Sequence, residues 1–215
     1  MVTRPVRRLL MAALCSLAVT SAAARVQPAR DTFKRSAELG KRTAKTSAAV
    51  DKYVTQLDKT EQALSSVSPA QDKGSKKRYQ SFSKEVNKLE RAQKHATSDI
   101  DKMKSTGAEY FSSWDKSIAQ MSNPELRQAS SERRSKIVKD HEELATTLSD
   151  VGSQLQPFMS NLHDLRAFLG TDLSPANVGK ASGMIQSSQA DAQALKDRIT
   201  GVQTTLKQFL SEAPN

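Results

Sequence analysis

The stretch that decides the fold is residues 137–169, IVKDHEELATTLSDVGSQLQPFMSNLHDLRAFL. Its apolar residues recur at alternating intervals of four and three, with one histidine among them. They are Ile137, His141, Leu144, Leu148, Val151, Leu155, Phe158, Leu162, Leu165 and Leu169. This spacing keeps one stripe of a helix facing a partner over many turns. The stretch therefore predicts a long helix packed lengthwise against others.

Two further stretches on either side carry the same spacing. The preceding one contains Phe82, Val86, Leu89, Gln93, Ala96, Ile100, Met103, Gly107, Tyr110, Trp114, Ser117 and Met121. The following one contains Val178, Ala181, Ile185, Ser188, Ala192, Leu195, Ile199, Val202, Leu206 and Phe209. Trp114 could stack on a ligand, but at this spacing we interpret it as a core residue.

Three breaks separate the helical segments. They lie at Ser68-Pro69 with Gly74, at Asn123-Pro124, and from Gly170 to Pro175. At the second break Asn123 can cap a helix and Pro124 can occupy its first turn, while Gly170 is placed to end the preceding helix. We predict an all-α fold, an elongated antiparallel helical bundle with coiled-coil-like packing and about four long helices at 31–67, 73–121, 124–169 and 175–211. The short second connection should place Trp114 near Ser130.

The first predicted helix has the weakest apolar pattern. Val50, Val54, Leu57 and Leu64 cover only its second half, and Phe33 is isolated near its start. We therefore expect its N-terminal turns to fray or to rest loosely on the second helix.

The first 24 residues have the organisation of an export signal. Arg4, Arg7 and Arg8 precede an apolar run at 9–19, and Ala22-Ala23-Ala24 provides small residues for cleavage. We predict a signal peptide at 1–24 and one elongated helical domain at 25–215, periplasmic or secreted and without a membrane span after processing. The alternative is a membrane anchor formed by an uncleaved signal. Lipid attachment at Cys15 is less favoured, because Leu14 precedes it where a small residue is usual.

Few residues suggest catalysis or metal binding. Cys15, the only cysteine, lies within the predicted signal, so the processed chain would have no thiol for disulfides, metal sites or nucleophiles. The three imidazoles, His95, His141 and His163, have no metal-binding spacing, and no Gly-rich phosphate loop is present. We interpret His141 as a polar residue that sets the register of the helices. The sequence predicts a non-enzymatic protein with no cofactor and no metal site.

Four motifs in the second half resemble the DUF2959 family of proteins of unknown function. In order, they are Glu109-Tyr110-Phe111-Ser112-Ser113-Trp114, Leu126-Arg127-Gln128-Ala129-Ser130, Pro157-Phe158-Met159 and His163-Asp164-Leu165-Arg166-Ala167-Phe168-Leu169. Their order and spacing match the family from about Ile100 onward. The resemblance implies a helical fold and an envelope location, as in the mostly exported bacterial members. It implies no activity.

The charge of the chain is unevenly distributed. Residues 25–121 carry 20 basic and 12 acidic side chains, a net charge of +8, whereas residues 122–215 carry 10 and 11, a net charge of −1. Five lysines share one face of the first predicted helix, about 155° from its apolar stripe: Lys34, Lys41, Lys45, Lys52 and Lys59. Four more cations cluster at the following turn: Lys73, Lys76, Lys77 and Arg78.

Two interpretations of these cations remain open. They form either a solvated face that keeps the protein dissolved or a contact site for an anionic envelope surface, such as lipid headgroups or an acidic polymer. Nucleic acid is not an expected partner, because aromatic residues are not interleaved with the basic ones. We therefore expect an exported scaffold or interaction protein of the bacterial envelope with an unknown envelope partner, or a peripheral binder of anionic surface. The sequence does not indicate the oligomeric state.

Overall fold

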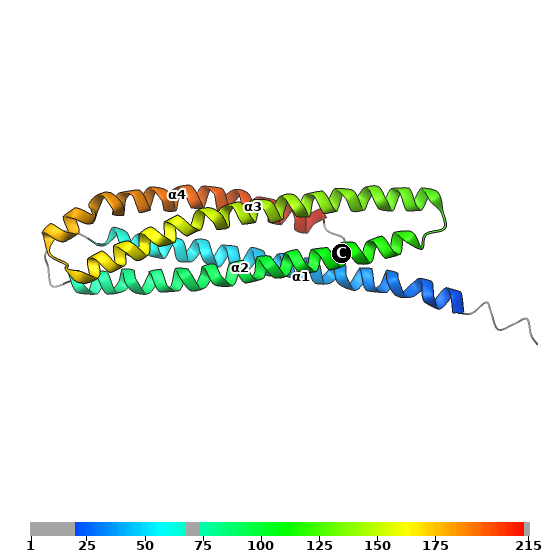
Figure 1. The fold of residues 1–215 in the computed structure, drawn as a ribbon, viewed down its shortest axis with the longest axis horizontal. Coiled ribbons are helices and arrows are strands. Elements are labelled where there is room, and N and C mark those ends of the chain that lie inside the picture. The colour runs from blue at the N-terminus through cyan, green and yellow to red at the C-terminus, as the bar shows by residue number, and fades with distance from the viewer. Residues whose placement is uncertain (1–19, 68–73, 213–215) are drawn as a thin grey trace, which may run out of the picture.

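The computed structural model describes residues 20–67 and 74–212, with side chains described from residue 30. It contains four helices: α1 (Thr20–Ser65), α2 (Ser75–Ala119), α3 (Pro124–Thr171) and α4 (Pro175–Glu212). They run side by side as an elongated bundle (Figure 1). Within the described residues there is no β-strand, and the predicted all-α fold is confirmed.

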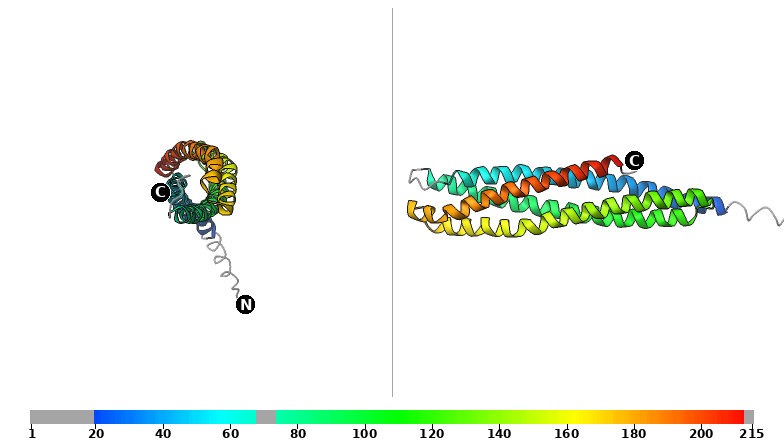
Figure 2. Two further views of the ribbon diagram at one scale, coloured as in Figure 1. Left: turned by 90° about the vertical axis from the view of Figure 1, so that its left-hand side faces the viewer. Right: turned by 90° about the horizontal axis from the view of Figure 1, so that it is seen from above.

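The helices follow one another around a ring, seen end-on in Figure 2. Each helix contacts its neighbours in the order α1, α2, α3, α4 and back to α1, and the contact between α1 and α2 is the most extensive. By these contacts α1 and α2 form one layer and α3 and α4 the other. In Figure 1, α4 lies along the top and α2 along the bottom, and α3 slants from the upper right to the lower left. Over the described residues, no helix is long and apolar enough to cross a membrane.

The predicted stripes of α3 and α4 form the core. All ten predicted positions of α4 are buried, and nine of the ten in α3 are buried, with Val151 partly so. In α2 the stripe is buried at 82–89 and at 103–114, whereas Gln93, Ala96 and Ile100 at its middle, and Ser117 and Met121 at its end, are half-buried. Gln93, Ala96 and Ile100 border a small apolar cavity of about 50 Å³ between the four helices.

The predicted capping and register of the α2–α3 hairpin are confirmed. Asn123 caps α3, accepting hydrogen bonds from the backbone nitrogens of Glu125 at 2.9 Å and Leu126 at 3.1 Å. Across the hairpin, Trp114 Nε1 donates to Ser130 Oγ at 2.9 Å, and Trp114 is 9% exposed. Trp114 is therefore a core residue that fixes the alignment of α2 and α3.

The prediction that Gly170 ends the third helix is wrong. α3 continues to Thr171, and Gly170 has no positive φ. Gly170 instead leaves room for the Tyr79 side chain, because a Cβ atom on Gly170 would lie 2.6 Å from the Tyr79 hydroxyl. That hydroxyl donates to the Arg166 carbonyl at 3.0 Å, which joins the start of α2 to the end of α3.

The first helix is longer and more closely packed than its apolar pattern suggested. α1 begins at Thr20 rather than near residue 31, in an alanine-rich segment of high helix propensity. From residue 36 onward it has a buried stripe with three-four spacing, in which hydroxyl residues occupy many of the positions. The stripe consists of Ser36, Leu39, Thr43, Thr46, Val50, Tyr53, Leu57, Thr60 and Leu64.

The small hydroxyl residues allow α1 and α2 to approach closely. Thr46 donates across the interface to the Asp99 carbonyl at 3.1 Å, and nearer the start of α1 Thr32 donates to the Ser113 carbonyl at 3.0 Å. Phe33 is 64% exposed, in agreement with its isolation in the sequence.

Candidate functional site

The predicted lysine row of α1 lies on the outer surface of the bundle. Its five members, Lys34, Lys41, Lys45, Lys52 and Lys59, are all exposed. Within the part of the chain that the structure describes, none of them forms an ion pair. Arg35 and Arg42, which lie on the α2 side of the helix, pair with Glu109 and Glu38. The row therefore presents free positive charge to solvent.

Only some of the cations that cluster at the turn before α2 are exposed to solvent. Lys73 lies outside the described residues, whereas Lys76 and Lys77 are exposed. Arg78 is half-buried, and its Nη2 donates to Ser75 Oγ at 3.2 Å. Arg78 thus takes part in the local structure at the start of α2.

A second row of cations on α2 was missed in the sequence. Lys77, Lys84 and Arg91 recur every seven residues and are exposed, and over 30–67 and 74–212 none of them forms an ion pair. The row lies on the outer side of α2, away from the buried Phe82, Val86 and Leu89. Lys84 interacts with Glu85, which accepts a hydrogen bond from Gln56 of α1 at 2.7 Å. The seven-residue spacing was visible in the sequence, but its relation to α1 required the packing of the two helices.

The register of the α1–α2 hairpin places these two rows at the same levels of the bundle. The bonds from Gln56 to Glu85 and from Thr46 to Asp99 fix the antiparallel alignment. By that alignment Lys59 lies at the level of Lys84, and Lys52 at the level of Arg91. The charge imbalance along the sequence is therefore a difference between two sides of the bundle, with the α1–α2 layer cationic and the α3–α4 layer nearly neutral.

The acidic residues along the α1–α2 edge are already engaged. Glu85 contacts Lys88 Nζ at 2.7 Å, and Asp99 lies 3.8 Å from Lys102 Nζ. Burial opposes ionisation of Glu85, but hydrogen bonds from Lys88 and Gln56 lower its pKa overall. The Glu85 carboxylate thus joins α2 to α1 and also interacts with nearby Lys84, whereas the Asp99 carboxylate pairs within its own helix.

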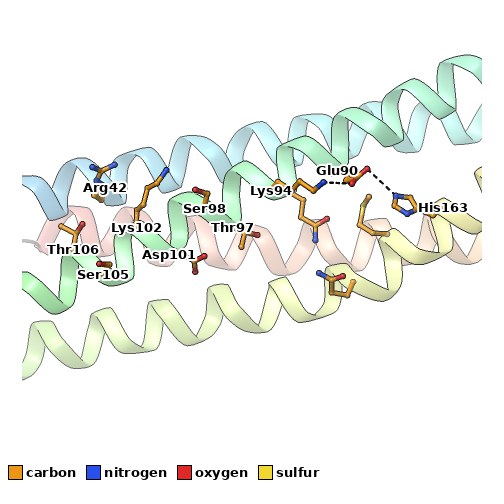
Figure 3. Close-up of a pocket in the computed structure, with 13 residues that line it drawn as sticks. Arg42, Glu90, Lys94, Thr97, Ser98, Asp101, Lys102, Ser105, Thr106 and His163 are labelled. Atoms are coloured by element: carbon orange, nitrogen blue, oxygen red, sulfur yellow. Dashed lines mark hydrogen bonds and ion pairs between the residues drawn. The ribbon is translucent and has the colours of Figure 1, made fainter.

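An open groove of about 840 Å³ follows α2 between α1 and α3 (Figure 3). Most of its charged side chains are paired, whereas Asp101 forms no ion pair within the described residues. Glu90 accepts from Lys94 at 2.9 Å and lies 4.0 Å from His163, as the dashed lines show, and the Lys94 contact lowers the pKa of Glu90. Arg42 at its other end contacts Glu38 at 2.9 Å. The groove is thus polar but has little unbalanced charge.

The three histidines lie in different surroundings. His95 is exposed, and His163 lies beside Glu90 in the groove. His141 is buried between Phe111, at 5.3 Å between ring centroids, and Phe209, at 5.8 Å. Among the described residues, no group of three or more His, Cys, Asp or Glu side chains is placed to hold a metal ion.

Comparison with known proteins assigns the chain to a family. A family model described as a protein of unknown function, DUF2959, matches residues 31–213. The chain belongs to the DUF2959 family. The match extends the resemblance seen in the second half to α1 and α2, so the cationic layer lies within the family region. Comparison with curated proteins and with solved structures gave no match.

Proposed function

We propose that this DUF2959 protein is a non-enzymatic scaffold or interaction protein of the bacterial cell envelope, acting through its long helical surfaces. The supporting observation is the arrangement of the bundle, in which apolar residues fill the seams and exposed faces run along the whole length. The three-four spacing of the seams favours coiled-coil packing. Export is proposed from the basic head, the apolar run at 9–19 and the alanines at 22–24.

Crosslinking in cells tests this role. A photoreactive residue would replace Ala48 on α1 or Ser187 on α4, both exposed, with the buried Ser188 as the matched control position. We expect one exposed position to crosslink to a defined envelope component, and the buried position to give no intermolecular product. Fractionation of the protein with the cytoplasm, or no product from any exposed position, would overturn the proposal.

A second proposed function is peripheral binding to an anionic envelope surface through α1. The exposed lysine row, without ion pairs among the described residues, supports it. Lipid headgroups attract such cations by about 1 kcal/mol for each residue near the surface. Changing Lys34, Lys45 and Lys59 to Glu should abolish retention on anionic vesicles at low salt, while leaving folding intact. Retention of the variant at the level of the unaltered protein would contradict this function.

A further inference from the structure

The α1–α2 layer carries like charges at matching levels of its two helices. Lys59 with Lys84 and Lys52 with Arg91 lie at matching levels of the hairpin, as fixed by the Gln56–Glu85 and Thr46–Asp99 hydrogen bonds. Neighbouring like charges repel, and such an arrangement lowers stability unless a counter-charge is supplied. Glu38, Glu85 and Asp99 pair with Arg42, Lys88 and Lys102, and only Lys84 of the two rows interacts with one of them, Glu85, so an external anion would supply most of the counter-charge.

The shape of the layer indicates the kind of anion. At 1.5 Å per residue the α1 row, from Lys34 to Lys59, extends about 37 Å, and two adjacent helices make the face about 20 Å wide. The charge is therefore spread over an area, which matches a planar surface better than a thin linear polymer.

The exposed large apolar residues lie outside these rows. They are Phe33, Leu126, Phe168 and Met184. Contact through the rows would therefore be electrostatic and sensitive to salt, with no apolar insertion from within the rows themselves.

We propose that the two rows form one docking face that lies side-on on an anionic lipid bilayer. This face, here called the cationic face, consists of Lys34, Lys41, Lys45, Lys52, Lys59, Lys77, Lys84 and Arg91. The inference rests on the second proposed function and adds the α2 row, the lipid surface and the orientation. The long axis of the bundle lies parallel to the membrane, with α3 and α4 directed away from it.

The test compares two triple variants of equal charge. One changes Lys77, Lys84 and Arg91 of α2 to Gln. The matched control changes Lys180, Arg198 and Lys207 of α4 to Gln, which are likewise exposed and, within the described ranges, form no ion pairs. The probe is sedimentation with phosphatidylcholine vesicles that contain or lack phosphatidylglycerol, at low and at physiological ionic strength. Urea melts would establish that both variants fold.

We expect the α2 variant to lose about a hundredfold in partition coefficient, because each cation near an anionic membrane contributes about fivefold. The α4 variant should bind nearly as well as the unaltered protein. Equal losses in the two variants would show that net charge alone acts, which overturns the docking face; the Lys34, Lys45 and Lys59 variant tests the second function separately. No binding of the unaltered protein at low ionic strength would overturn both.

Two further measurements test the orientation of the bundle and the assignment of the anion as lipid. A nitroxide on Ala48→Cys of α1, in a Cys15→Ser background, should be shielded by vesicles from an aqueous relaxation agent, whereas one on Ser187→Cys of α4 should stay accessible. Equal shielding at the two positions would contradict the side-on orientation. Binding to a soluble linear polyanion such as heparin, without binding to anionic vesicles, would overturn the lipid assignment.

Discussion

Gly107 on α2 packs directly against the imidazole of His141 on α3. A Cβ atom added to Gly107 would overlap the ring, with His141 Cε1 only 2.5 Å away. The ring cannot move aside easily, because Phe111 and Phe209 pack around it. The two residues thus set how closely α2 and α3 approach at this level.

Replacing Gly107 with Ala should therefore destabilise the protein, although alanine favours helix formation. Overpacking of a tight core usually costs about 1–3 kcal/mol, which exceeds the gain of up to about 1 kcal/mol in helix propensity. Gly201→Ala on α4 is the control, because no atom outside its own helix lies within 4 Å of its added Cβ. That change should stabilise by up to about 1 kcal/mol. Urea unfolding measures both changes in the free energy of unfolding. An increase in stability in the Gly107→Ala variant would contradict the packing described.

His141 should make stability depend on pH near neutrality. Burial lowers the pKa of His141, although the Met103 carbonyl and nearby Glu142 act in the opposite direction and Lys104 in the same one. The unfolded chain, with a histidine pKa of about 6.5, then binds more protons than the folded one just below that pH. The free energy of unfolding should keep its highest value above about pH 6.5 and decrease as the pH falls below that value.

Urea melts between about pH 7.5 and 5.5 would measure this decrease. A His141→Leu variant should lose most of it, whereas a His95→Gln variant should keep it, because His95 is exposed. Parallel pH profiles for the unaltered protein and His141→Leu would show that His141 is not the group responsible.

The central seam should carry much of the stability. Leu148 is 4% exposed and Leu155 is 8% exposed, both facing the middle of the bundle. Truncating either to Ala should cost about 2–5 kcal/mol, whereas Lys45→Ala on the outer face should change stability by less than about 0.5 kcal/mol. Equally mild effects for the two kinds of mutant in urea would show that these leucines are not core residues.

The first half of α1 should be as firmly packed as the rest. Leu39 is 1% exposed, so Leu39→Ala should cost about 2–5 kcal/mol, and backbone amides near Thr43 and Thr46 should exchange slowly. Phe33→Ala, at a position 64% exposed, is the control and should have little effect. Rapid exchange at residues 36–46 would support the looser helix that the apolar pattern suggested.

Export gives a prediction that can be checked by sequencing. The basic head, the apolar run and Ala22-Ala23-Ala24 place the first residue of the processed protein at Arg25 or within a few residues of it. N-terminal sequencing of the protein from the envelope fraction would identify that residue. An intact Met1 or a lipid on Cys15 would favour an anchored form instead.

The sequence predicted the fold well where the seam residues are apolar. In α4, Ile185, Leu195 and Phe209 stand out at heptad positions, and even Ser188 is buried as its spacing required. The seam of α1 has the same spacing, but Ser36, Thr43, Thr46 and Thr60 occupy four of its positions. Hydroxyl residues are equally common on solvent-facing surfaces, so hydrophobicity alone did not reveal them. Their burial depends on hydrogen bonds such as that from Thr46 to Asp99.

The candidate site could be predicted from the sequence only in part. The lysines of α1 face away from its apolar stripe, and that direction follows from helical geometry alone. The relation of Lys84 and Arg91 to the α1 row required the packing of α2 on α1, which places them at the levels of Lys59 and Lys52. Gly170 was misjudged because glycine at a helix end usually terminates the helix, whereas here Tyr79 occupies the space.

The shorter length of α4 makes the two ends of the bundle different. Its last residue, Glu212, pairs with Lys136 at 2.6 Å, so the first turns of α3 continue past the end of α4. One end of the rod is thus built from four helices and the other from three. With unlike ends as well as unlike sides, the molecule has no rotation that maps it onto itself. Any array made by packing copies of it in one orientation would therefore have a direction along its length.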